Sequence, residues 1–159
     1  HLSDIIKTNV WRAEMGSRDV VEVLGGRKVL GKRVSGAMDM AHLIEMGFPE
    51  PVLERVKDAL ALTTREVAFA LQVSEKTIGR LRGAPLRRLS PATSDRLYRI
   101  ARLFALAEEV LESADAARDW LRERQVGLGN RIPLELMGTE AGSREVEDLL
   151  LRIEHSVLS

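Results

Sequence analysis

The sequence predicts an all-α protein, and three observations support that prediction. Hydrophobic residues form 45% of the 159-residue chain and aromatic residues only 4%, so Leu, Ala and Val must pack most of the core. Apolar residues recur at helical spacing, whereas the alternating runs typical of strands are almost absent. Glycine and proline residues stand between the periodic segments, where they end one helix and begin the next.

The first part of the chain is weakly patterned. A helix around residues 17–24 should end at Gly25-Gly26. The basic stretch 27–35 is expected to be an extended arm, either a flexible lead-in or a contact for a DNA minor groove. The next two helices are expected near residues 38–46 and 51–60.

The strongest local signal lies in residues 63–82, which predict a helix, a tight turn and a second helix. The small Ala68 lies where the two helices would cross, Val73 would fill the inside of the turn, and Ser74 has a hydroxyl suited to cap the second helix. Gln72 occupies a turn position that is usually glycine, because the backbone there often has a positive φ. With a cationic outer face, this arrangement is typical of a DNA-binding helix-turn-helix.

The second helix of this unit and the loop beyond it carry the candidate DNA contacts. Cations gather on the outward face of the helix, and no exposed acid follows Glu75. The residues expected to contact DNA are Lys76, Thr77, Arg80, Arg82, Arg87 and Arg88. A purely structural helical hairpin is the alternative, but such a hairpin needs no cationic face.

Charge is strongly segregated although the net charge of the chain is zero. Residues 74–102 hold eight basic and two acidic residues, whereas residues 103–159 hold six basic and twelve acidic residues. The basic block suits phosphates. The acidic block suits either a basic protein surface or, as the alternative, solvated helix faces.

Ser90-Pro91 is a strong helix start, and the helix it opens runs to about Glu112. This helix is apolar on two sides, so it is either buried within the fold or shared with a second subunit, and we expect a homodimer. The elements expected after it are a short helix capped by Ser113, a turn at residues 127–130, a short helix opened by Pro133 and a last helix from Thr139.

Several sequence blocks follow one another in a specific order over about residues 43–157. They are LIEMGFP at 43–49, LSPATSDRL at 89–97 with Arg99, AARDWL at 116–121, LG at 128–129, IPLELM at 132–137, TEAG at 139–142, EVEDLL at 145–150 and IEH at 153–155. In this order they resemble the Xre/MbcA/ParS-type antitoxins of bacterial toxin–antitoxin modules. Asn130 stands where that family often has a second glycine, and Ser156 where glycine often follows Glu-His.

The resemblance implies a helix-turn-helix (Xre-like) DNA-binding domain at residues 38–97 and a small helical toxin-binding domain at residues 98–159, after an N-terminal arm at 1–37. The first domain would bind operator DNA of its own operon, as a dimer. The second would bind and neutralise a cognate RES-type toxin, which consumes NAD, by covering its active site. The residues expected to contact the toxin are Leu128, Gly129, Asn130, Glu154, Ser156, Val157, Leu158 and Ser159.

The sequence offers no catalytic or metal-binding pattern. It has no cysteine, its histidines (His1, His42 and His155) are far apart, and it lacks phosphate-loop, dinucleotide and nucleophile motifs. We therefore expect no enzyme activity and no cofactor. No apolar run approaches membrane-spanning length and no signal peptide is visible, so a cytoplasmic protein without membrane contact is expected.

A second function class remains open from the sequence alone. A stand-alone helix-turn-helix repressor would carry the same basic unit, with a C-terminal domain that dimerises or senses a ligand. A toxin gene beside this one, or toxicity relieved by co-expression, separates the two functions.

Overall fold

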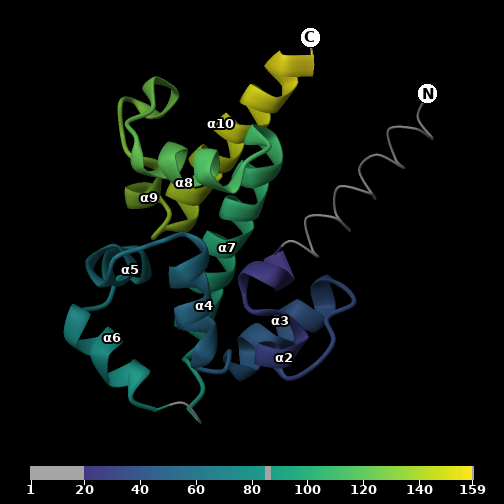
Figure 1. Ribbon diagram of the computed structural model, residues 1–159, viewed down its shortest axis with the longest axis vertical. Coiled ribbons are helices and arrows are strands. Elements are labelled where there is room, and N and C mark those ends of the chain that lie inside the picture. The colour runs from purple at the N-terminus through teal and green to yellow at the C-terminus, as the bar shows by residue number, and fades with distance from the viewer. Residues whose placement is uncertain (1–19, 85–86, 159) are drawn as a thin grey trace.

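The computed structural model describes residues 20–84 and 87–158, with only the backbone of residues 157 and 158, and within these ranges it contains helices and no strand (Figure 1). A helical segment at residues 20–23 comes first. The helices that follow are α2 (Gly26–Leu30), α3 (Ala37–Met46), α4 (Pro51–Ala59), α5 (Thr64–Leu71), α6 (Glu75–Arg82), α7 (Pro91–Leu111), α8 (Ala114–Arg122), the 3-10 turn η1 (Val126–Leu128), α9 (Pro133–Leu136) and α10 (Glu140–Leu158). The all-helical fold expected from the sequence is confirmed.

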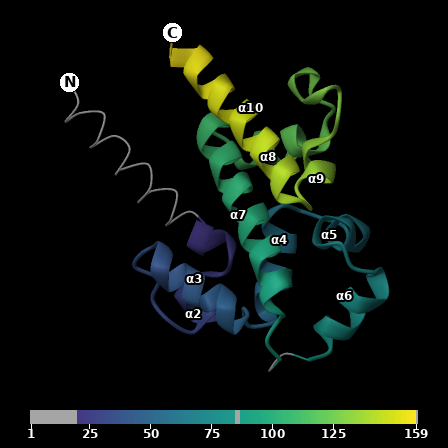
Figure 2. The same ribbon diagram turned by 180° about the vertical axis from the view of Figure 1, so that it is seen from behind.

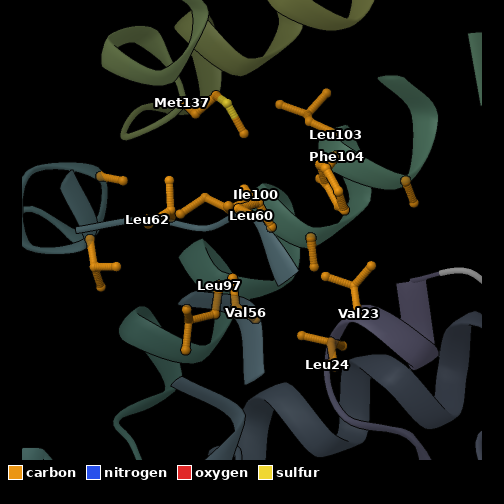
Figure 3. Packing of buried hydrophobic residues seen from close by; sticks show 14 of the residues in the cluster. Val23, Leu24, Val56, Leu60, Leu62, Leu97, Ile100, Leu103, Phe104 and Met137 are labelled. Carbon is orange, nitrogen blue, oxygen red and sulfur yellow. The ribbon is translucent and has the colours of Figure 1, made fainter. Parts of the chain in front are cut away.

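Helix α7 is the central element, and α3, α4, α5, α8 and α10 all pack against it (Figures 1 and 2). Leu97, Ile100, Leu103 and Phe104 of α7 are almost completely buried. Figure 3 shows these four side chains within a cluster that also holds residues of α4 and the segment after α9. The apolar character of α7 on two sides is therefore explained within one chain, by burial against helices on either side.

The start of α7 is fixed by hydrogen bonds to the segment between α3 and α4. The Ser90 hydroxyl accepts the Thr93 N–H at 3.1 Å, as a helix cap does. The buried Ser94 hydroxyl accepts the Phe48 N–H at 2.8 Å and donates to the Ser90 carbonyl oxygen, also at 2.8 Å. Two segments that meet at residues 46 positions apart are thus joined through one serine, which explains why that position takes a small hydroxyl residue.

The expectation of an extended arm at residues 27–35 is wrong for residues 27–30. Gly26–Leu30 is a short helix, bounded by Gly25 and Gly31 with φ angles of +106° and +81°. Leu30 is only 2% exposed and belongs to the main core. Burial of this apolar side chain anchors the segment, which has too few residues for a helical period to be recognisable in the sequence.

The last third of the chain forms a compact helical group around the second half of α7. Helix α8 is capped by Ser113, whose hydroxyl accepts the Ala116 N–H at 3.1 Å. Thr139 caps α10 in the same way by accepting the Gly142 N–H at 3.0 Å. None of the helices in the described ranges is long and apolar enough to cross a membrane.

Candidate functional site

Helices α5 and α6 form the helix-turn-helix unit expected from the sequence. Thr63 and Glu66 make a reciprocal capping box at the start of α5, and the Ser74 hydroxyl accepts the Thr77 N–H at 3.1 Å to cap α6. Between the helices, Gln72 has φ 56° and ψ 41°. This left-handed backbone is the conformation for which glycine is usually selected, so the expected positive φ is confirmed.

The first turns of α6 bring together three of the candidate DNA contacts. Lys76 and Arg80 are exposed, and Thr77 lies half-buried between them. The Arg80 Nη2 donates to the Thr77 Oγ1 at 3.3 Å, and this oxygen lies 2.9 Å from the Ser74 hydroxyl. Because Ile78 on the inner side is completely buried, the polar face of α6 is directed away from the core.

The other three candidate cations are held differently. Arg82 forms an ion pair with Glu54 of α4, with both side chains about one-third exposed. Arg88 Nη1 donates to the Gly47 carbonyl oxygen at 2.8 Å. Arg87 is exposed. Arg82 and Arg88 thus have structural partners within the chain, whereas Arg87 extends from the loop after α6.

Two carboxylates beneath α6 were missed by the sequence analysis. Glu50 is only 4% exposed, and it lies one helical turn before Glu54 at the start of α4. Burial raises the pKa of Glu50, the charge of Glu54 raises it further, and Arg82 partly offsets both. Their spacing of four residues was the available signal, because residues i and i+4 share one face of a helix.

The turn at residues 126–131 packs on the middle of α10. A Cβ added at Gly127 would lie 2.6 Å from a Leu149 methyl carbon, so this turn lies directly against the helix. Leu128 is 8% exposed and points into the core. Gly129 and Asn130 are exposed, and both have left-handed backbones with φ of 65° and 63°. Of the expected toxin contacts in the turn, Gly129 and Asn130 are accessible and Leu128 anchors them.

The exposed surface of this turn includes an apolar side chain that the sequence analysis did not select. Val126 is 89% exposed, three residues before Gly129. The turn is closed by the Gln125 N–H, which donates to the Arg131 carbonyl oxygen at 3.0 Å. Val126 thus adds an exposed apolar side chain to the surface formed by Gly129 and Asn130.

The remaining expected toxin contacts lie at the C-terminal end of α10. This end extends past α7 and α8, at the opposite end of the molecule from α6 (Figures 1 and 2). Glu154 is half-buried and Ser156 is exposed, with the Ser156 hydroxyl donating to the Ile153 carbonyl oxygen at 2.8 Å. Val157 and Leu158 continue the helical backbone, while their side chains and the whole of Ser159 lie outside the described residues.

Two family models match adjacent parts of this chain. Residues 39–102 match the antitoxin Xre-like helix-turn-helix domain, and residues 106–155 match the antitoxin Xre/MbcA/ParS C-terminal toxin-binding domain. This chain belongs to the Xre/MbcA/ParS antitoxin family. The antitoxin therefore has a helix-turn-helix domain followed by a toxin-binding domain, as expected from the resemblance. Between the two matches lie only residues within α7, so this single helix extends through both domains.

Three proteins named antitoxin Xre are similar to the chain. The protein from Yersinia enterocolitica is 29% identical over 131 residues, which cover 82% of this chain and 88% of the relative. The protein from Pseudomonas putida is 37% identical over 60 residues, 38% of each chain. The protein from Photorhabdus laumondii is 32% identical over 71 residues, 42% of this chain and 48% of the relative.

Among the described residues no cluster of His, Asp or Glu has the arrangement needed to hold a metal ion. His42 is exposed on α3, and His155 is exposed near the end of α10. Both positions are surface positions on helices that belong to different parts of the fold.

Proposed function

We propose that this antitoxin neutralises a cognate RES-type, NAD-consuming toxin by covering its active site, and that it represses its own operon by binding operator DNA. The observation that carries the proposal is the pairing of the two family domains at opposite ends of one helical body. Such an arrangement permits the two partners to be bound without competing for the same surface. The antitoxin itself acts by binding, in the cytoplasm, and needs no cofactor.

The toxin contact is proposed to involve the turn at 128–130 and the end of α10 from Glu154 to Ser159. Residues 103–159 hold twice as many acidic as basic residues, which complements a cleft built to hold the pyrophosphate of NAD. Val157 and Leu158 are apolar residues suited to enter such a cleft. Leu128 contributes by holding the exposed Gly129 and Asn130 against α10.

Deletion of residues 156–159 tests the toxin contact. The shortened antitoxin should keep its helical content and its DNA affinity, while losing its ability to protect cells and to inhibit NAD consumption by the toxin. The matched control is a variant that keeps the tail and removes one exposed charge elsewhere, Glu135→Gln. Full protection by the shortened protein, both in cells and in the NAD assay, would falsify this part of the proposal.

The DNA-binding part is tested separately with DNA from upstream of the gene. Wild-type protein should bind this DNA more tightly than an unrelated duplex of the same length, and a reporter under the upstream promoter should be repressed. We also propose that the antitoxin binds DNA as a homodimer, because two helix-turn-helix units read two half-sites. Sedimentation that finds only monomer at high micromolar concentration, with and without DNA, would contradict the dimer.

The second candidate function is a stand-alone repressor with a C-terminal domain that dimerises or senses a ligand. Co-expression with the neighbouring gene product distinguishes the two. Relief of toxicity and a stable complex on purification support the antitoxin, whereas DNA binding without any such partner supports the repressor.

A further inference from the structure

Two arginines of α8 reach the connection that leads into the helix-turn-helix. Arg118 Nε donates to the Ala59 carbonyl oxygen at 2.8 Å, and Arg122 Nη2 donates to the Ala61 carbonyl oxygen. The two arginines are four residues apart and so lie on one face of α8. Their acceptors lie at the end of α4 and in the turn after it, where a helix terminus carries partial negative charge that a cation stabilises.

Arg122 also holds the first turn of α5. Its Nε and Nη2 atoms lie 3.2 Å and 3.3 Å from the two carboxylate oxygens of Glu66, which is a bidentate arrangement. The same carboxylate accepts the Thr63 N–H at 2.9 Å in the capping box. Burial raises the pKa of Glu66, but the Thr63 N–H and the Arg122 guanidinium outweigh it and keep the pKa below its ordinary value. A single charged carboxylate therefore joins the cap of α5 to α8.

The other end of α5 is also held from outside the helix-turn-helix. Gly138, between α9 and α10, lies so close that a Cβ there would be 3.3 Å from the Ala70 carbonyl oxygen. Arg96 of α7 donates to the Leu71 carbonyl oxygen at 3.3 Å. Helix α5 is thus in contact at both ends with groups that belong to α7, α8 and the segment after α9.

This support matters because the connection between α4 and α5 has an unfavourable backbone. Ala61 has a φ of 52°, a left-handed conformation that is sterically unfavourable for a residue with a Cβ. External hydrogen bonds stabilise such a turn. Because α6 follows α5 through a tight turn, a change in the angle of α5 also changes the angle of α6. Base contacts in the major groove depend on that angle more than phosphate contacts do.

We propose that Arg118 and Arg122 are positioning residues for DNA recognition, through which the toxin-binding domain holds α5 and α6 at the angle needed to read base edges. This inference rests on the proposed binding of operator DNA by α6. The two arginines act indirectly, since α8 lies on the opposite side of α5 from α6 (Figures 1 and 2).

The test compares Arg118→Gln and Arg122→Gln with the matched control Arg144→Gln. Arg144 is an exposed arginine of the same domain that forms an ion pair with Glu140 of its own helix. Fluorescence anisotropy gives the affinity of each full-length variant for the upstream DNA and for an unrelated duplex. We expect Arg122→Gln to lose about tenfold for the upstream DNA, a cost of the size of one base contact. Its affinity for unrelated DNA should fall less than about twofold, because that binding rests mainly on phosphates.

The ratio of the two affinities separates positioning from a merely structural role. Partial unfolding lowers the active fraction and so reduces both affinities equally, which leaves the ratio unchanged. An unchanged ratio in Arg122→Gln, or an equal fall in the Arg144→Gln control, therefore overturns the inference. Glu66→Gln should also lower the ratio of the two affinities. The double variant Glu66→Gln/Arg122→Gln should lower this ratio no further than Arg122→Gln alone, because both changes break the same Arg122–Glu66 pair.

Amide hydrogen exchange tests the positioning contacts independently of whether the protein binds operator DNA. If wild-type protein shows no preference for the upstream DNA, operator binding is contradicted while the positioning contacts are still measurable. Faster exchange confined to α5 and α6 in Arg122→Gln supports the inference. Unchanged protection of both helices in that variant overturns it.

Discussion

Arg102 of α7 and Glu147 of α10 form a bidentate ion pair between the long central helix and the last helix. The Arg102 Nη1 and Nη2 atoms lie 2.6 Å and 3.1 Å from the Glu147 Oε1 and Oε2 atoms. Both side chains are about two-thirds buried. The hydrogen bonds from Arg102 hold the pKa of Glu147 below its ordinary value of 4.5, because they outweigh the burial that raises it. The pair connects the long helix that extends through both domains to the helix that ends at the proposed toxin contact.

Glu147→Gln should therefore lower the free energy of unfolding at pH 7, by about 1 kcal/mol for a partly exposed pair. A carboxyl with a depressed pKa stabilises the fold above its unfolded-state pKa, and this contribution is lost as the pH falls through its folded-state pKa. The difference between wild type and variant should thus shrink below about pH 4. Urea unfolding at pH 7 and pH 3.5 measures this difference in the free energy of unfolding. Glu140→Gln, which removes a carboxylate from an exposed pair on α10, is the control and should show little effect at either pH.

Gly47→Ala should destabilise the protein by at least about 2 kcal/mol, since strain and overlap act together. Gly47 has a φ of +87°, and a Cβ there would overlap the Leu89 carbonyl oxygen. The neighbouring Leu89 N–H donates to the Phe48 carbonyl oxygen at 2.8 Å, so the two segments have little freedom to separate. Gly36, at the other end of α3, has an extended backbone and open space around a Cβ. Gly36→Ala should cost less than about 1 kcal/mol, and equal losses in thermal unfolding of the two variants would contradict the argument.

Gln72→Gly should stabilise the antitoxin by about 1 kcal/mol, because glycine adopts the left-handed backbone at this turn without the steric cost of a Cβ. Gln72→Val should have the opposite effect, since a β-branched side chain tolerates positive φ poorly. The free energy of unfolding of both variants, measured in urea, gives the order. If Gln72→Gly is less stable than wild type, the Gln72 side chain, whose Nε2 would lie 3.4 Å from a Cβ added at Gly138, contributes more than the strain costs.

Helix starts could be predicted from the sequence because capping is local chemistry. Ser74, Ser90 and Ser113 were each expected to cap a helix, and each accepts a backbone N–H three residues later. The hydroxyl and the N–H that it satisfies lie within one turn of the chain. No knowledge of the tertiary fold is needed to pair them.

Contacts between distant segments could not be predicted in this way. Arg82 was expected to be an outward cation, but it pairs with Glu54, which is 28 residues away. Arg118 and Arg122 reach acceptors about 60 residues away and gave no local signal at all. The side-chain periodicity of a helix shows which face is polar, but which element lies opposite that face depends on the path of the whole chain.

Arg80 and Arg87 of the candidate DNA surface should make different kinds of contact with DNA. Arg80 extends from the exposed face of α6 beside Lys76, so Arg80→Ala should weaken binding to the upstream DNA more than to an unrelated duplex, by about 1–3 kcal/mol for a lost base contact. Arg87 is exposed in the loop after α6, which suits a phosphate contact. Arg87→Ala should weaken binding to both duplexes and reduce the slope of log affinity against log salt by about 0.9, because fewer counterions are released.

Arg152→Ala supplies the control for these measurements. Arg152 is exposed on α10, the helix whose C-terminal end lies opposite α6 (Figure 1), so its removal lowers the net charge equally without changing the proposed surface. Titrations at several salt concentrations separate the two roles, since a general loss of positive charge would affect all three variants alike. If the double variant Arg80→Ala/Arg87→Ala binds the upstream DNA as tightly as wild type, DNA is not bound through this face of α6 and its loop.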